Sequence, residues 1–235
     1  MKCRIDKYLC DMSIGSRSEI KQYIKKHMVC INGEITDNPA AKVDTDIDTI
    51  TFDGNIVSYS EYEYFILNKP AGVVSATTDP CETTVLDLIS SKRKDLFPVG
   101  RLDKDTEGLL LITNDGELSH NLLSPKKHVD KTYYVEVEGV LTEDIRIQFE
   151  NGLQVDKDFL AMPAALELLS ESTANITIRE GKFHQIKRMM EAVGCKVTYL
   201  KRLRMGPLSL PDNLLPGQSR SLTQAEISLL RGNKC

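Results

Sequence analysis

The chain reads Gly100-Arg101-Leu102-Asp103-Lys104-Asp105-Thr106-Glu107-Gly108-Leu109-Leu110 where a cluster of charged side chains meets a run of leucines. The apolar residues that follow predict a buried strand over 109–113, closed by turn residues at 114–116. The acids and Gly108 also have the spacing of a calcium loop, but Asn114 stands where the twelfth position requires a bidentate glutamate. Calcium binding is therefore disfavoured, which leaves Asp103 either as the cap of a turn or as a reactive carboxylate.

Outside this segment, strands and helices follow one another without a fixed order. Alternating patterns and β-branched or aromatic residues predict strands at 64–67, 132–138, 164–169 and 175–179. Helical spacing predicts helices at 84–90, 117–123 and 186–193, and a capping box at Thr223 begins a last helix. Because neither a regular strand–helix–strand alternation nor a repeat period is present, the predicted fold class is α+β, with a largely antiparallel mixed sheet flanked by helices.

The first part of the chain is predicted to be a smaller module. Apolar spacing predicts a helix at 5–12, and a capping box from Ser16 to Glu19 begins a second helix over 17–26. Asn32-Gly33 predicts a type I′ turn between short strands. The polar stretch 58–63 is the candidate linker. The predicted domains are therefore residues 1–59 and residues 60–235.

Composition indicates an ordinary soluble globular protein, with 235 residues of which 41% are hydrophobic and 27% charged. The N-terminus has no apolar signal segment, and no run approaches the ~18 apolar residues that a membrane-spanning helix needs, so a cytoplasmic location is expected. The six scattered cysteines contain no Cys-x-x-Cys pair, which favours reduced thiols over a structural zinc site.

The net charge of -4 gives no overall sign of nucleic-acid binding, so the local charge has to be considered. Residues 1–30 contain seven Lys or Arg against three acids, and residues 179–204 contain eight against two. Each zone would serve as a contact surface for a polyanion, although each would equally suit a solvated charged face.

Several motifs extend the pattern around Asp103. Residues 100–110 resemble the signature of pseudouridine synthases of the RsuA/RluA superfamily, and residues 1–59 resemble the αL-type RNA-binding module found in a small-subunit ribosomal protein. The remaining motifs resemble the RsuA-like branch and occur in its order: Leu67-Asn68-Lys69-Pro70-Ala71-Gly72, then Ser124-Pro125 with His128 and Lys131-Thr132-Tyr133, then Glu180-Gly181-Lys182-Phe183-His184-Gln185-Ile186-Lys187-Arg188-Met189-Met190. This resemblance spans nearly the whole chain.

The resemblance implies an RNA pseudouridine synthase, an isomerase that breaks the C1′–N1 bond of a uridine and makes a C1′–C5 bond. Asp103 matches the catalytic carboxylate, which would act either as a nucleophile or by removing a ribose proton. Lys187 is the expected counter-ion, because an unpaired buried carboxylate tends to protonate. Tyr133 matches the tyrosine that stacks on the target base, although its neighbours alone indicate an ordinary strand aromatic.

RNA contacts are expected in two parts of the chain. Around the pocket, the resemblance implies substrate or RNA binding by Arg101, His184, Gln185 and Arg188, with a surface ion pair as the alternative for Arg101. In the N-terminal module, the expected phosphate contacts are basic side chains: Arg4, Lys7, Arg17, Lys21, Lys25 and Lys26.

The segments 131–133 and 184–189 most resemble the enzymes that modify a single uridine of small-subunit (16S) ribosomal RNA. The expected partner is ribosomal RNA or a pre-ribosomal small-subunit particle, bound by a monomer that uses no membrane, metal or small-molecule cofactor. Three alternatives stay open. They are a large-subunit (23S) synthase of the same branch, a non-catalytic RNA-binding ribosome-assembly protein, and a metal hydrolase using Asp103 and Asp105, which lacks further ligands at sensible spacing.

Overall fold

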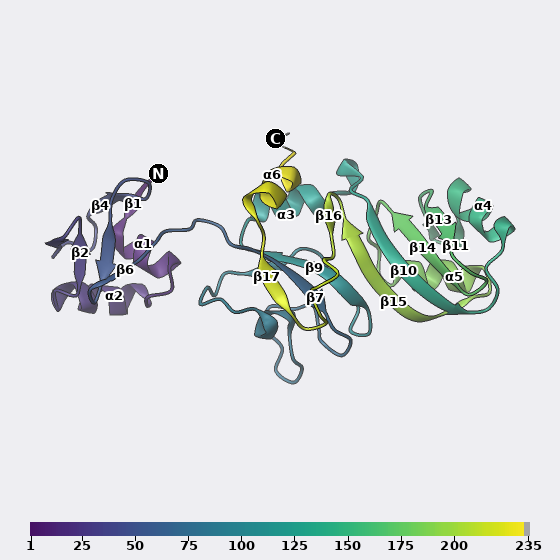
Figure 1. Ribbon diagram of the computed structural model, residues 1–235, viewed down its shortest axis with the longest axis horizontal. Coiled ribbons are helices and arrows are strands. Elements are labelled where there is room, and N and C mark those ends of the chain that lie inside the picture. The colour runs from purple at the N-terminus through teal and green to yellow at the C-terminus, as the bar shows by residue number, and fades with distance from the viewer. Residues whose placement is uncertain (233–235) are drawn as a thin grey trace. The chain divides into compact units, whose positions relative to one another are not determined.

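The structure is a computed structural model that describes residues 1–232, so Cys235 lies outside the described residues. The chain divides into two compact units (Figure 1). Unit 1 contains Met1–Glu63 together with Ser91–Asp95, and unit 2 contains Tyr64–Ser90 and the chain from Leu96 onward. Each unit has its own hydrophobic core.

Unit 1 is built from two short helices and two small sheets. Helices α1 (Ile5–Asp11) and α2 (Arg17–Lys25) pack their apolar faces into one core. A two-stranded sheet pairs β1 with β4, and a four-stranded sheet has the order β3-β2-β5-β6. The strands are β1 (Lys2–Arg4), β2 (Val29–Ile31), β3 (Glu34–Ile35), β4 (Lys42–Asp44), β5 (Ile50–Phe52) and β6 (Asn55–Ile56).

Local chemistry accounts for the bounds of these elements. The predicted capping box begins α2, with Ser16 N donating to the Glu19 carboxylate at 2.8 Å and Glu19 N donating to Ser16 Oγ at 3.3 Å. Between β2 and β3, Asn32 and Gly33 have φ angles of 53° and 86°, as a type I′ turn requires. Both predictions are confirmed.

A short segment from further along the chain completes unit 1. The Arg93 side chain is 5% exposed, donates to both carboxylate oxygens of Asp95 at 2.9 and 2.8 Å, and donates to the Ser60 carbonyl at 2.7 Å. Ser91 Oγ donates to the Glu63 carboxylate at 2.7 Å. Nothing in the sequence pattern had indicated that Ser91–Asp95 belongs with the N-terminal residues.

Unit 2 is organised around one mixed sheet, which has nine strands within residues 1–232. Its order is β13-β14-β10-β15-β9-β7-β17, with β16 paired to β15 and β8 to β9. The β9–β15 ladder is parallel and the others are antiparallel. The α+β class with a largely antiparallel sheet is therefore confirmed. The strands are β7 (Tyr64–Lys69), β8 (Phe97–Pro98), β9 (Glu107–Thr113), β10 (Lys131–Glu138), β13 (Ala165–Leu168), β14 (Thr173–Ile178), β15 (Lys196–Met205), β16 (Leu208–Ser209) and β17 (Ser219–Ser221).

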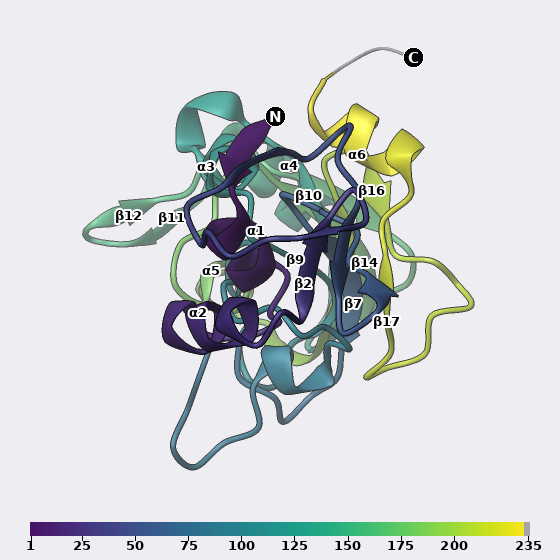
Figure 2. The same ribbon diagram turned by 90° about the vertical axis from the view of Figure 1, so that its left-hand side faces the viewer.

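The helices of unit 2 cover two separate parts of this sheet. Helices α4 (Glu143–Asn151) and α5 (Gln185–Ala192) bury side chains in the core with β10 and β14. Helices α3 (Gly116–Leu123) and α6 (Gln224–Leu230) contribute to a second core with β7 and β9. Figure 2 shows β17 and α6, both yellow, together at one edge. The remaining short elements are the 3-10 helix η2 (Pro125–Lys127) and the strand pair β11 (Gln154–Asp156) and β12 (Phe159–Leu160).

Two expectations from the sequence are wrong. The helix expected over 84–90 is only a 3-10 helix, η1 (Val85–Leu88), because Ile89 has extended backbone angles and the chain then enters the segment that joins unit 1. Arg202, counted in the basic zone 179–204, is 2% exposed and donates to the Leu109 carbonyl at 2.7 Å. Arg202 therefore supports the sheet interior and does not belong to a charged surface.

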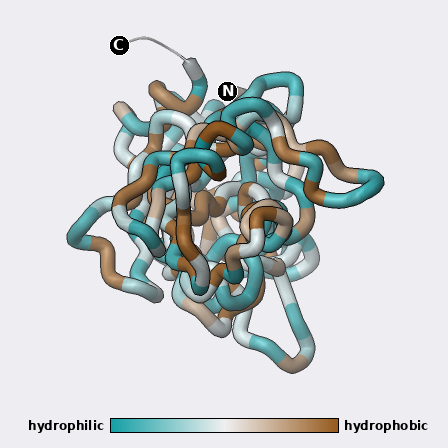
Figure 3. Tube along the Cα trace, turned by 90° about the vertical axis from the view of Figure 1, so that its right-hand side faces the viewer, coloured by the Kyte–Doolittle hydropathy of each residue, from teal (hydrophilic) through white to brown (hydrophobic). Residues whose placement is uncertain are grey.

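Polar and apolar residues alternate in short stretches along the trace (Figure 3). This pattern is typical of sheets and helices that bury one face in a core and expose the other to solvent. Among the helices formed by residues 1–232, none has the length and apolar character needed to cross a membrane.

Candidate active site

The loop that carries Asp103 ends where β9 approaches β15 unusually closely. Gly108 has a φ angle of 100°, and a Cβ atom there would lie 2.3 Å from the Arg202 carbonyl oxygen. Only glycine fits this position without displacing backbone. The close approach pairs Gly108 with Arg202 in the parallel ladder. The loop then lines the same cleft as Leu200 of β15 and Tyr133 of β10.

Lys69, at the end of β7, supports the same loop from inside the protein. Its residue exposure is 0%, and its ammonium donates to the carbonyls of Pro70, Lys104 and Thr106 at 3.1, 3.1 and 2.9 Å. Burial lowers the pKa of Lys69 to about 8, against the opposing charges of nearby acids. Lys69 belongs to the Leu67–Gly72 motif, from which the sequence predicts no role for its side chain.

The other end of the loop is held by a hydroxyl group. Ser75 Oγ donates to the Leu102 carbonyl at 2.8 Å and accepts from Leu102 N at 3.1 Å. The backbone on both sides of Asp103 is therefore anchored by buried side chains, and such anchoring fixes the direction of a reactive group.

The Asp103 carboxylate lies between two groups from the start of α5. Lys187 Nζ is 3.3 Å from Asp103 Oδ2, and His184 Nε2 is 3.5 Å from Asp103 Oδ1. The side chains of Asp103 and Lys187 are 27% and 26% exposed, so both are partly shielded from water. The Lys187 ammonium is therefore close enough to form an ion pair with the Asp103 carboxylate.

Lys187 also makes a closer contact that had not been predicted. Its Nζ donates to the two carboxylate oxygens of Asp105 at 2.6 and 2.9 Å. Burial lowers the pKa of Lys187, but the hydrogen bond to Asp105 and the charges of both aspartates outweigh burial and raise it. The hydrogen bond from Lys187 in turn holds the pKa of Asp105 below its ordinary value. The Lys187 ammonium thus forms ion pairs with both Asp103 and Asp105.

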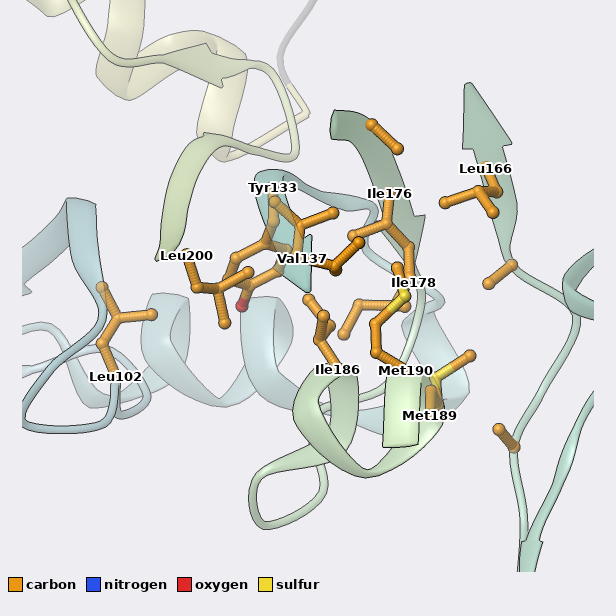
Figure 4. Packing of buried hydrophobic residues seen from close by; sticks show 14 of the residues in the cluster. Leu102, Tyr133, Val137, Leu166, Ile176, Ile178, Ile186, Met189, Met190 and Leu200 are labelled. Atoms are coloured by element: carbon orange, nitrogen blue, oxygen red, sulfur yellow. The ribbon is translucent and has the colours of Figure 1, made fainter. Parts of the chain in front are cut away.

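Tyr133, on β10, forms the apolar wall of the cleft. Its residue exposure is 8%, and it pairs with Ile176 on one side and with Arg202 on the other. Figure 4 shows its hydroxyl on the side where Leu200 and Leu102 lie. Within residues 1–232 no hydrogen-bond partner of this hydroxyl is found.

These groups line one open cleft of about 440 Å³ in unit 2. Of the residues predicted for the site, it is lined by Arg101, Asp103, Tyr133, His184, Gln185 and Lys187. The Tyr133 ring and the Asp103 carboxylate therefore face the same open cleft.

Two predicted site residues have structural contacts of their own. Gln185 is 4% exposed, and its Nε2 donates to Glu180 Oε1 at 2.9 Å. Arg188 does not line the cleft, because its guanidinium pairs with Asp156 and lies 4.8 Å from the centre of the Phe159 ring. Contact of either residue with RNA stays a prediction.

The predicted phosphate contacts of the N-terminal module all lie in unit 1 and are exposed. Arg4 donates to both oxygens of Asp6 at 3.0 and 2.6 Å, and Lys7 lies 3.3 Å from Asp11. No ion pair is found within residues 1–232 for the four others: Arg17, Lys21, Lys25 and Lys26. These four cations are the more available to a phosphate.

The metal alternatives meet an obstacle in this geometry. The Lys187 ammonium touches both Asp103 and Asp105, which are the carboxylates that a metal would need. In the described part of the chain, no group of three or more His, Cys, Asp or Glu side chains could hold a metal ion. The cation that contacts these two carboxylates is the Lys187 ammonium.

Comparison with known proteins agrees with the geometry. Residues 63–192 match the family described as RNA pseudouridylate synthase, and residues 3–46 match the S4 domain. A Bacillus subtilis (strain 168) protein named "Uncharacterized RNA pseudouridine synthase YtzG" is 45% identical over 97% of this chain and 98% of its own length. "Ribosomal small subunit pseudouridine synthase A" of Escherichia coli (strain K12) is 40% identical over 96% of this chain and 98% of its own. A crystal structure of a pseudouridylate synthase is 36% identical, with a TM-score of 0.69 over 97% of this chain and 99% of its own.

Proposed function

The chain belongs to the RsuA-like branch of the RNA pseudouridine synthases, with an N-terminal S4 domain, and on that premise we propose that it isomerises one uridine of small-subunit (16S) ribosomal RNA with Asp103 as the catalytic carboxylate. The single observation that carries the proposal is the Asp103 carboxylate in a cleft, 3.3 Å from the Lys187 ammonium and facing the same space as Tyr133.

The reaction needs no cofactor to balance. The C1′–N1 bond of the uridine breaks, the C1′–C5 bond forms, the C5 proton is lost and N1 gains a proton. A carboxylate serves this chemistry either by attacking a ring or sugar carbon or by removing a ribose proton. Both routes use Asp103 as a carboxylate, and the Lys187 ammonium lies 3.3 Å from it as a counter-ion.

The other groups have supporting roles in the proposal. The Tyr133 ring offers a face on which an unstacked uracil lies, and its hydroxyl is available to move a proton. Arg101 is exposed at the rim, where it would hold the phosphate of the flipped nucleotide. His184 contacts Asp103 and would help to position it.

The choice of 16S RNA rests on relatives and on short motifs. Relatives that are 40% identical are named for the small ribosomal subunit. The name of the relative that is 45% identical gives RNA but no ribosomal subunit. A 23S substrate is therefore the second candidate, because the chemistry of the branch is the same. No contact among the described residues favours 23S RNA over 16S RNA.

Purified protein and RNA test this proposal directly. Transcripts of 16S and 23S RNA, and partly assembled small-subunit particles, would carry tritium at uridine C5, which is released when C1′–C5 forms. Carbodiimide-dependent reverse-transcription stops would then map the product. We expect one new stop in 16S RNA with the wild-type protein and none with Asp103→Asn, which still binds RNA.

The outcomes separate the parts of the proposal. Tritium release from 23S RNA alone would contradict the substrate. Activity of Asp103→Asn would contradict the role of Asp103. RNA binding without any release, from all three substrates, would favour the non-catalytic alternative.

A further inference from the structure

Phe183 is exposed at a position where the fold does not require an aromatic ring. It precedes α5 in the turn after β14, and its residue exposure is 75%. Among exposed large apolar residues of the described chain, the only other aromatic is Tyr62, at 37% and in unit 1. Single exposed apolar residues are common, so the position of this ring matters more than its exposure.

The Phe183 ring is stacked on a residue of the active site. The ring centres of Phe183 and His184 are 3.8 Å apart with an angle of 19° between their planes. His184 lines the cleft, and its Nε2 lies 3.5 Å from Asp103. The exposed Phe183 ring therefore stacks on the His184 ring, which in turn contacts the Asp103 carboxylate.

The turn that presents these rings is held firmly. Gln185 Oε1 accepts from Lys182 N at 3.0 Å, and Glu180 Oε1 accepts from Gln185 Nε2 and from Met162 N at 2.9 Å each. His184 has a φ angle of 48°, which is uncommon for a residue other than glycine. Strained backbone of this kind persists where surrounding contacts enforce it, and it is concentrated at functional sites.

The surroundings of Phe183 suit a nucleotide better than a protein partner. Lys182 and Arg188 lie over the Phe159 ring at 4.0 and 4.8 Å, and Arg101 is exposed at the cleft. One ring among charged side chains offers enough apolar area for one base, whereas a stable protein interface buries at least about 1,200 Å². Base stacking on aromatic rings beside cations is how proteins hold single-stranded RNA.

We propose that the Phe183–His184 pair is a stacking platform for the base next to the target uridine, so that Phe183 is a substrate-positioning residue. This inference rests on the proposed function, because a flipped uridine in the cleft leaves its neighbour unstacked at the rim. The stacked neighbour keeps the RNA single-stranded at the entrance and fixes the direction in which the strand leaves.

The absence of tryptophan from the sequence provides a direct probe. Phe183→Trp in an Asp103→Asn background places a single indole on the platform and prevents turnover. Titration with 16S and 23S transcripts should quench its fluorescence. The matched control is Leu169→Trp in the same background, since Leu169 is 51% exposed beyond the far end of β14, near Thr173.

Kinetics separate stacking from simple apolar packing. Phe183→Leu keeps an apolar side chain but removes the flat ring, and we expect its KM for RNA to rise about tenfold or more with little change in kcat. Phe183→Tyr keeps the ring and should restore a KM close to that of the wild type. Thermal unfolding of all variants should be unchanged, because the ring is exposed.

The results distinguish failure of this inference from failure of the proposed function. If the wild type forms pseudouridine but Phe183→Leu has an unchanged KM, or the two tryptophans are quenched equally, the platform is wrong and the function stands. If Phe183→Trp alone is quenched while the wild type modifies neither RNA, Phe183 stacks on an RNA base, but the proposed function is wrong and that base has no target uridine beside it.

Discussion

Lys69 illustrates how one side chain prepares the site without touching a substrate. It is buried under the Asp103 loop and donates to three backbone carbonyls, two of which belong to that loop. Buried acceptors that lose their donor are costly, by about 1–3 kcal/mol each. The ammonium therefore acts as a positioning group for Asp103.

Removal of this ammonium should affect turnover more than RNA binding. Lys69→Met keeps the length of the side chain but removes the Lys69 donor from the carbonyls of Lys104 and Thr106. The Lys104 carbonyl keeps the Gly72 amide as a donor. We expect kcat to fall about tenfold or more, with KM within about threefold. Lys104→Met is the control, because the Lys104 side chain is 52% exposed and pairs with Glu82 at the surface. Equal effects of the two substitutions would contradict the role of Lys69.

The pKa of Lys69 gives a pH dependence with opposite signs for stability and activity. Its folded value of about 8 lies below the ordinary value of 10.5. Between these values the unfolded chain binds more protons, so the contribution of Lys69 to stability rises with pH. A neutral amine, however, has two donors for three carbonyls. We therefore expect kcat to fall as the pH rises through about 8, a step that kinetic profiles of Lys69→Met should lack.

At the scale of elements, α5 and the turn before it bring the site together. Ile186, Met189 and Met190 bury one face of the helix, which leaves Lys187 directed to the Asp103 loop. The helix begins at His184 without a side-chain cap. Its start is instead held by Gln185 and Glu180, which are both buried.

Gln185→Leu tests how far this turn depends on that hydrogen bond. The substitution leaves the Glu180 carboxylate with the Met162 amide but without the Gln185 donor. We expect the free energy of unfolding to fall by about 1–3 kcal/mol, and kcat/KM to fall with it. Gln154→Leu, at an exposed position of β11, should change stability by less than about 0.5 kcal/mol. Denaturant unfolding of both variants measures the difference, and equal values would argue against the role of Gln185.

At the scale of the whole molecule, the candidate active-site cleft and the predicted phosphate contacts belong to different units. The cleft lies in unit 2, whereas the exposed cations of α2 lie in unit 1. The chain passes from unit 2 into unit 1 at Ser91 and re-enters unit 2 at Leu96. Within unit 1, this segment contacts Ser60 and Glu63. Affinity and turnover should therefore respond to different substitutions.

A triple substitution of Lys21, Lys25 and Lys26 to Gln tests this separation. Each phosphate contact to single-stranded RNA contributes about 0.7 to the slope of log affinity against log salt. We expect a weaker complex with a slope smaller by up to about 2, while kcat at saturating RNA stays within about twofold. Lys196→Gln, whose ammonium pairs with Glu138 at 3.3 Å, is the control. A loss of kcat in the triple variant would show that the two functions are not separate.

Local features of this protein could be predicted from its sequence because they depend on neighbours in the chain. The capping boxes at Ser16 and Thr223 and the turn at Asn32-Gly33 are all present. The family motif around Asp103 likewise predicted the class of enzyme, and the matched family agrees.

Contacts between distant residues were decided only by the tertiary structure. Lys187 meets Asp105 across 82 positions and Lys69 meets Thr106 across 37, and neither pair has a signal in local spacing. The same holds for Arg202, which looks like a surface cation in sequence but lies inside the sheet beside Gly108. Charge and periodicity determine what a residue can do, whereas the packing of strands and loops determines which partner it meets and whether water reaches it. Around Asp103, the sequence indicated the carboxylate and its counter-ion Lys187, whereas only the fold brought Lys69 and Ser75 to the backbone of the loop.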